Sequence, residues 1–148
     1  MADTALYDSP LGPITLTFDG TVLTGLHIGT HVDDRVSPPP TVLRWLDRYF
    51  SGQNPDFVPP IRLVGTDFQR RVWQELLTIP YGHTTTYGEL ARRLGCRSAQ
   101  AVGQAVGRNP IAIIVPCHRV VGSDGSLTGY AYGLERKEYL LNLESKGR

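Results

Sequence analysis

Apolar and polar residues alternate along residues 5–28 in the pattern of short β-strands. The alternation over 14–18 predicts one strand, and the apolar positions of 22–28 predict another after a turn at Asp19 and Gly20. Together with the segment around Tyr7, these strands predict a small antiparallel sheet.

A proline break at 38–40 ends this pattern, and apolar residues then recur at helical spacing. The recurring positions are Val42, Leu43, Leu46, Tyr49 and Phe50. They predict a helix that covers the sheet. A second proline-rich stretch, 55–60, predicts a linker. Residues 1–60 are therefore expected to form a small N-terminal lobe, and residues 61–148 a C-terminal domain.

Helices dominate the prediction for the C-terminal domain. Thr66 and Gln69 match a capping box that opens a helix, and this helix should end before the Pro-Tyr-Gly turn at 80–82. Its predicted buried face carries Phe68, Val72 and Leu76.

Two short helices around a tight turn are predicted next. Thr86 and Glu89 match a second capping box, Gly95 ends the helix, and Ser98 caps another that runs to Gly107. Helical hairpins without any role in DNA binding are common, but the arrangement also fits a helix-turn-helix. The predicted fold class is thus α+β, with a winged helix-turn-helix-like element in a mainly helical C-terminal domain.

The rest of the chain is predicted to hold a buried strand and a final helix. The apolar run 111–115 predicts the strand, which leads into Cys117, and a turn follows at 122–125. Leu134, Lys137, Leu141 and Glu144 are spaced to share one face of the final helix.

Composition narrows the possible classes of protein. Of 148 residues, 41% are hydrophobic and 20% charged, which fits a globular protein, and no apolar run approaches the ~20 residues that span a bilayer. The first residues show no basic region followed by an apolar stretch, so no secretory signal is predicted and a cytoplasmic location is expected.

The charge is divided unevenly along the chain. Lys and Arg minus Asp and Glu give 4 − 7 = −3 for residues 1–64 and 11 − 7 = +4 for residues 65–148. This asymmetry weakly favours a polyanionic partner for the C-terminal part, because Lys and Arg neutralise phosphates.

Cysteine and histidine give no sign of a metal or a disulfide framework. Cys96 and Cys117 are the two cysteines, and in a reducing compartment they should stay free thiols. The histidines at 27, 31, 83 and 118 are scattered at spacings that do not suit a metal, so no metal is predicted.

Cys117 could be an inert core thiol, but its neighbours suggest a nucleophile. A thiol reacts as the thiolate, and His118 or Arg119 could promote its formation. If the segment is extended, the two successive side chains point to opposite faces, and His118 would need a bridging water to reach Cys117. A cysteine hydrolase would need a second site that activates water, and a phosphatase would need an arginine where Ser123 stands.

The sequence around Cys117 resembles a known family. NPIAIIVPCHRVVGSDGSLTGY, at 109–130, is similar to the active-site signature of the O6-alkylguanine-DNA alkyltransferases. GTDFQRRVWQELLTIPYGHTTTYGELA upstream and GLERKEYLLNLE downstream extend the similarity over residues 65–144. The N-terminal part resembles the smaller, variable lobe of the family.

The resemblance implies an irreversible, stoichiometric repair reaction without a cofactor. Cys117 would accept the alkyl group from O6 of a guanine, with His118 linked to it through water and Glu144 orienting His118. Asn109 would tie the recognition helix to the segment carrying Cys117, and Tyr87 would stabilise the flipped nucleotide and assist the departing guanine. Whether O4-alkylthymine is also a substrate is left open.

The partner implied is double-stranded DNA containing alkylated bases. The second helix of the helix-turn-helix would enter the minor groove, the damaged nucleotide would be flipped out, and the protein would act as a monomer associated with the nucleoid when bound. Residues expected to contact DNA or the flipped nucleotide are Arg97, Gln100, Ala101, Gly103, Arg108, Arg119, Leu127, Tyr130, Ala131 and Tyr132.

Two positions depart from the family pattern. Gln100 stands where relatives place an arginine that fills the gap left by the flipped base, which predicts weaker or more salt-tolerant binding of DNA, and Arg97 is a candidate to share that role. Tyr132 stands where relatives often have glycine, which predicts a narrower pocket that accepts methyl groups but handles bulky benzyl groups poorly.

Two other functions fit parts of the sequence. One is a sensor of alkylated DNA that binds lesions without chemistry, although such proteins lack the acceptor cysteine that is present here as Cys117. The other is a helix-turn-helix transcription regulator, which would prefer a DNA sequence over a lesion.

Overall fold

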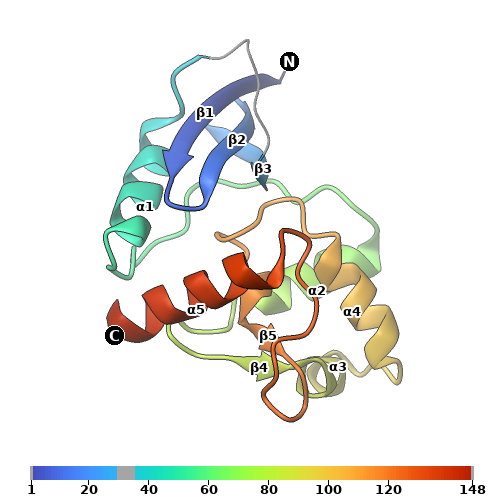
Figure 1. Ribbon diagram of the computed structural model, residues 1–148. Coiled ribbons are helices and arrows are strands. Elements are labelled where there is room, and N and C mark those ends of the chain that lie inside the picture. Colours follow the sequence, from blue (N-terminus) through green and yellow to red (C-terminus); the bar gives the residue numbers. More distant parts are fainter. Residues whose placement is uncertain (1, 30–35, 148) are drawn as a thin grey trace.

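The computed structural model describes residues 2–29 and 36–147, and its N-terminal part is a three-stranded antiparallel sheet beside one helix (Figure 1). The elements are β1 (Asp3–Ser9), β2 (Gly12–Asp19), β3 (Val22–Ile28) and α1 (Pro40–Phe50). The strands pair in the order β1-β2-β3. The predicted sheet and its helix are thus confirmed.

Alternating apolar residues of β2 pack the sheet against the hydrophobic core. Ile14, Leu16 and Phe18 of β2 are buried in the core, as their spacing predicts. Helix α1 is fixed to β1 through Tyr7, whose hydroxyl donates to Asp47 at 2.7 Å.

The C-terminal part is mainly helical, with a small two-stranded parallel sheet. Its elements are α2 (Asp67–Leu76), β4 (Thr85–Thr86), α3 (Tyr87–Leu94), α4 (Ala99–Gly107), the 3-10 helix η1 (Cys117–Arg119), β5 (Val120–Val121) and α5 (Leu134–Gly147). Strands β4 and β5 pair with each other. The α+β class is confirmed.

Local capping signals define the helix starts. The Thr66 hydroxyl accepts from the Gln69 amide at 3.1 Å and the Gln69 side chain accepts from the Thr66 amide at 3.0 Å, so the first capping box is complete. The second box is only half formed. The Thr86 hydroxyl accepts from the Glu89 amide at 3.1 Å, but the Glu89 carboxylate binds Arg92 instead of reaching back.

Helices α3 and α4 form the predicted pair around a tight turn. Gly95 ends α3 in the left-handed conformation, with φ +66°, and the Ser98 hydroxyl caps α4 by accepting from the Ala101 amide. Helix α2 packs behind both, and the Trp73 indole donates to the Ala105 carbonyl at 2.8 Å.

The predicted strand over 111–115 is wrong. The segment is a series of tight turns, in which the Val115 amide donates to Ile111 and the Cys117 amide donates to Val115. Ile113 has a φ of +71°, which no strand residue adopts. All five side chains of the run are buried, which explains why they are apolar. A buried segment of turns has the same continuous apolar sequence as a buried strand, so the sequence does not distinguish the two.

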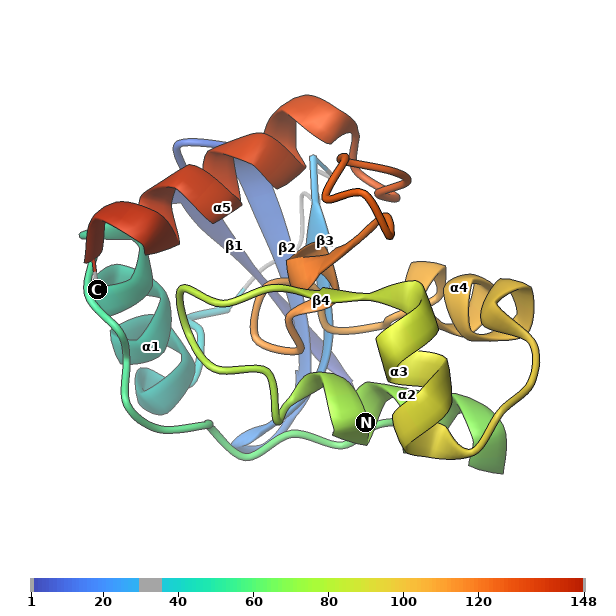
Figure 2. The ribbon, with the colours of Figure 1, turned by 90° about the horizontal axis from the view of Figure 1, so that it is seen from below.

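The two parts share one hydrophobic core. The outer edge of β3 bonds to the linker, where the Leu23 amide donates to Pro60, and to the turn segment, where the Leu26 amide donates to Pro110. Helix α5 lies across the junction, and its C-terminal end is beside α1 (Figure 2). This arrangement brings side chains of the N-terminal part close to the segment that carries Cys117.

The buried face of α5 differs from the prediction. It is centred on Lys137, Leu140 and Glu144, whereas Leu134 is exposed. The first turn of α5 extends beyond the core, so the apolar spacing of Leu134 does not lead to burial.

Two further observations concern only the described part of the chain. No helix in it is long and apolar enough to cross a membrane. No three His, Cys, Asp or Glu side chains in it gather in a way that could hold a metal ion, and His31 lies outside the described residues.

Candidate active site at Cys117

Cys117 lies in the wall of a cavity of about 140 Å³ between α4 and the loop before α5. Seven residues singled out in the sequence line it: Tyr87, Gly103, Asn109, Cys117, Tyr130, Ala131 and Tyr132. Val106, Gly107 and Gly129 complete the lining. The folded chain therefore brings together residues up to 45 positions apart around one thiol.

Asn109 fixes the segment that carries this thiol. Its side-chain amide donates to the Val115 carbonyl at 2.7 Å, and its oxygen accepts from the Ile111 amide at 3.0 Å. The buried amide thereby joins the end of α4 to the turns before Cys117, as the sequence suggested.

The environment of Cys117 sets the reactivity of its thiol. The side chain is 7% exposed, and burial raises the pKa of the thiol. Asn109 and the ammonium group of Lys137 act in the opposite direction and lower the pKa of Cys117. The thiol is consequently protonated in the resting protein and needs a base to react at neutral pH.

His118 is that candidate base, and Glu144 holds it. The two are fully buried, with His118 Nε2 2.5 Å from Glu144 Oε2. Burial alone would raise the pKa of Glu144, but hydrogen bonds from His118 and Arg119 outweigh it and hold the pKa well below its usual range. Because the ionised carboxylate only accepts hydrogen bonds, Nε2 carries the imidazole proton.

The other ring nitrogen of His118 is therefore the basic one. Among the described residues, Nδ1 has no hydrogen-bond partner although it is buried. Burial lowers the pKa of His118, which keeps the imidazole neutral and able to accept a proton at Nδ1. The extended backbone assumed from the sequence is wrong, because Cys117 and His118 lie in the 3-10 helix η1.

Arg119 does not belong with the residues expected to contact DNA. Its side chain is buried, and its guanidinium donates to Glu144 at 2.8 and 3.1 Å and to the Ile79 carbonyl at 2.7 Å. The positive charge of Arg119 is paired inside the protein with Glu144, the carboxylate that holds His118.

Tyr87, the first residue of α3, lies across the cavity. Its hydroxyl donates to the Thr128 carbonyl at 3.0 Å, and burial raises the pKa of the phenol. The hydroxyl therefore stays protonated at neutral pH, and it gives its one proton to the Thr128 carbonyl.

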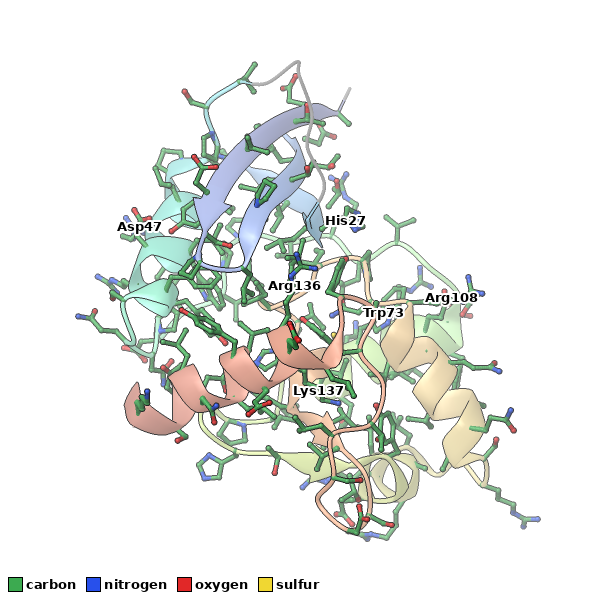
Figure 3. All side chains as sticks on the ribbon, viewed as in Figure 1. His27, Asp47, Trp73, Arg108, Arg136 and Lys137 are labelled. Atoms are coloured by element: carbon green, nitrogen blue, oxygen red, sulfur yellow. The ribbon has the colours of Figure 1, made fainter. Side chains whose placement is uncertain are left out.

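Tyr132 reaches from the cavity to the N-terminal sheet. Its hydroxyl lies 3.1 Å from Nδ1 of His27, which is placed on β3 (Figure 3), and its ring packs edge-on against Tyr130. The phenol ring occupies part of the cavity wall, as the sequence predicted.

A groove along α4 adjoins the cavity. Its lining includes Gln100 and Gln104, and it shares Tyr87, Gly103 and Gly129 with the cavity. Arg97 is exposed before α4, and Arg108 is exposed after it (Figure 3). Ala101 and Leu127 are partly buried, and they line neither the cavity nor the groove. A polymer lying along α4 would thus pass the mouth of the cavity between two arginines.

From the sequence alone, no role at the site is assigned to two residues, Lys137 and Tyr49. Lys137 is 0% exposed and donates to the carbonyls of Val120, Thr128 and Gly129. Tyr49 of α1 donates to Glu144 at 2.6 Å. A lysine at an inward-facing helix position could have indicated the first, but nothing distinguished Tyr49 from the apolar residues around it.

Known proteins resemble the chain along its whole length. Residues 4–63 match the ribonuclease-like domain of the 6-O-methylguanine DNA methyltransferases, and residues 67–146 match their DNA binding domain. The methylated-DNA–protein-cysteine methyltransferase of Mycobacterium tuberculosis is 51% identical over 146 residues, which is 93% of this chain and 88% of the relative. That of Methanosarcina acetivorans is 44% identical, covering 95% of this chain and 96% of the relative.

Solved structures agree with these matches. The O6-methylguanine methyltransferase of M. tuberculosis superposes with a TM-score of 0.89 at 45% identity, covering 100% of this chain and 95% of the other. The M. tuberculosis OGT in complex with DNA gives 0.88 at 48% identity, covering 96% and 92%. The chain belongs to the 6-O-methylguanine DNA methyltransferase family.

Proposed function

We propose that this chain repairs DNA by direct reversal, transferring a methyl group from O6 of a guanine in DNA to Sγ of Cys117. The observation that carries the proposal is the position of the thiol. It lies in the wall of a cavity that adjoins a groove along α4, and the next residue in the chain is a histidine paired with a carboxylate.

The cavity supports the proposal that the damaged nucleotide leaves the helix. A base stacked in duplex DNA cannot approach a buried thiol, and flipping it out costs a few kcal/mol that contacts to the DNA backbone can offset. Helix α4 would lie in the minor groove, with Gln100 near the vacated position and Arg97 and Arg108 near phosphates. Gly103 and Gly129 leave room for the nucleotide to enter.

The reaction begins with proton transfer from the Cys117 thiol to Nδ1 of His118 through a water molecule. The thiolate then attacks the methyl carbon, an S–C bond forms, and the bond between that carbon and O6 breaks. The electron pair passes to the guanine, which leaves as an anion and is neutralised by a proton. Tyr87 assists this step when its hydroxyl turns from the Thr128 carbonyl to the guanine and donates a hydrogen bond or its proton there.

The reaction consumes the protein. A thioether is stable to water and thiols, and no second site in the proposed mechanism would remove the methyl group. The proposed chemistry needs no cofactor. We further propose that the protein acts as a monomer, and that it associates with the nucleoid while it is bound to DNA.

Single-turnover kinetics test the stoichiometry. Successive additions of a duplex containing one O6-methylguanine should restore guanine until one lesion per chain has been repaired, and no further. Continued repair beyond one equivalent would contradict the suicide reaction. Lesion-selective binding without any repair would favour a non-catalytic sensor.

A further inference from the structure

Tyr49, a residue of the N-terminal part, contacts both members of the buried pair formed by His118 and Glu144. It is 0% exposed, and helix α1 positions it by stacking its ring on Trp45, with centroids 5.1 Å apart. Its hydroxyl lies 2.6 Å from Glu144 Oε2 and 3.4 Å from His118 Nε2.

Packing alone does not explain the hydroxyl. A phenylalanine would fill the same volume among these rings, whereas a buried hydroxyl is costly unless it has a partner. The Glu144 carboxylate can only accept, so the Tyr49 hydroxyl donates its single proton to Oε2. Burial, followed by the charge of Glu144, raises the pKa of Tyr49 well above its usual value, so this donor is not lost at any ordinary pH.

Tyr49 and His118 therefore compete for one oxygen. Oε2 accepts from the Tyr49 hydroxyl, from His118 Nε2 and from the Arg119 guanidinium, while Oε1 accepts from Arg119 and from the Gly82 amide. Each additional donor spreads the negative charge and weakens the pull of the carboxylate on the imidazole proton. Tyr49 thereby limits how strongly Glu144 favours the imidazolium.

We propose that Tyr49 is a positioning residue for methyl transfer, which orients Glu144 and keeps His118 neutral so that Nδ1 can accept the proton of Cys117. This inference rests on the proposed function. It gives the N-terminal part, which resembles the smaller, variable lobe of the family, a direct connection to the reacting centre through α1.

Other charged and titratable groups around His118 also influence its pKa, and their effects must be distinguished from that of Tyr49. Burial lowers the pKa of His118, hydrogen bonding to Glu144 raises it, and Arg119 and Lys137 lower it. Tyr81 faces Glu144 from the loop before β4 and packs edge-on against Tyr49, and Cys117 precedes His118 in η1. Tyr49 and Tyr81 are both neutral phenols whose hydroxyls can be removed without changing the charge of the cluster, and of the two only Tyr49 donates to Glu144 in the described structure.

The experiment compares the pH dependence of the single-turnover rate for the wild type and Tyr49→Phe. Removing the hydroxyl concentrates the charge of Glu144 on its bond to His118, so the imidazole should be protonated at higher pH. The acid limb of the profile should shift upward by about half a unit to one unit, which is roughly three- to tenfold slower transfer below the midpoint. A purely structural role would slow transfer equally at every pH.

Tyr81→Phe is the matched control. In the described structure its hydroxyl is buried without a hydrogen-bond partner, and its ring lies 6.2 Å from that of Tyr49. Its removal should leave the midpoint unchanged. Equal midpoints for the wild type and Tyr49→Phe would overturn the inference, as would an equal shift in Tyr81→Phe.

An NMR titration and a 3-fluorotyrosine variant test the role of Tyr49 even if repair or folding fails. NMR titration of His118 in the free protein should show the same upward shift in Tyr49→Phe, and it needs no repair reaction. If the wild type repairs no lesion, the proposed function fails while this titration still decides the role of Tyr49. If Tyr49→Phe does not fold, 3-fluorotyrosine at position 49, a stronger donor that keeps the hydroxyl, should shift the midpoint downward, and no shift would overturn the inference.

Discussion

Lys137 and Tyr87 donate to the same backbone oxygen, the carbonyl of Thr128, at 3.1 Å and 3.0 Å. One extends inward from α5 (Figure 3) and the other begins α3, and the ammonium lies 6.0 Å from the centre of the Tyr87 ring. The loop that forms a wall of the cavity is thus held from both sides by side chains that also face Cys117.

Lys137→Met should make the Cys117 thiol less acidic and the fold less stable. The ammonium lowers the pKa of Cys117, so its removal should move the pH midpoint of iodoacetamide labelling at Cys117 upward. Leaving its carbonyl partners without a donor should also cost about 1–3 kcal/mol of unfolding free energy. Lys146→Met, at an exposed position of the same helix, is the control and should change neither quantity. An unchanged labelling midpoint would show that Lys137 acts only on the loop.

Glu144→Gln should destabilise the protein in a pH-dependent way. The substitution leaves Arg119 buried without its counter-charge, which typically costs roughly 3–5 kcal/mol. The folded-state pKa of Glu144 lies well below its unfolded value, so its contribution is complete above the unfolded pKa and disappears as the pH falls.

Urea unfolding of the wild type and Glu144→Gln at several pH values tests this pH dependence of stability. The difference in unfolding free energy should be largest at neutral pH and should narrow as the pH falls from about 5 toward the acid range. Glu138→Gln, at an exposed position of α5, should leave stability nearly unchanged. A difference that stays constant over this range would contradict the ionised, buried carboxylate.

Gln100→Arg should tighten binding to duplex DNA. Gln100 is exposed at the start of α4 and lines the groove beside the cavity. An arginine there adds a phosphate or base contact, which should steepen the dependence of log K on log salt by about 0.9 per phosphate neutralised. Gln104→Arg adds the same charge to the same groove and should help less, because it is farther along the helix. Equal affinity of the wild type and Gln100→Arg across a salt titration would exclude this role.

Tyr132 should set the size of the alkyl group that is accepted. Its ring lines the cavity, so Tyr132→Gly should increase labelling of Cys117 by free benzylguanine relative to the wild type. Tyr132→Phe removes only the hydroxyl that contacts His27, and it should keep the exclusion of the benzyl group. Efficient benzyl labelling of the wild type that does not change in Tyr132→Gly would count against the idea.

Local signals in the sequence predicted the scaffold well. Thr66, Gly95 and Ser98 act within one helical turn, so their capping roles depend on neighbouring residues alone and are visible in the sequence. The alternation in β2 is equally local. The segment over 111–115 shows the limit, because continuous burial hides whether a chain is extended or turned.

The candidate site was predictable only where a motif marks it. Cys117, His118 and Asn109 lie within nine residues of one another, and the resemblance identified them. The burial of Arg119 depends on Glu144 and Ile79, which are 25 and 40 positions away, and this arginine was therefore mistaken for a surface residue that contacts DNA. The contact between Tyr49 and Glu144 joins residues 95 positions apart, and only the fold shows it.

Methyl transfer to Cys117 is tested most directly by the intact mass of the protein after incubation with a duplex containing one O6-methylguanine. Methyl transfer to Cys117 should add about 14 Da stoichiometrically, because a methyl group replaces the thiol proton, and peptide mapping should place the gain on Cys117. Cys117→Ala should bind the same duplex and gain nothing. A wild type that binds the lesion selectively without a gain in mass, or that gains the mass at another residue, would contradict methyl transfer to Cys117.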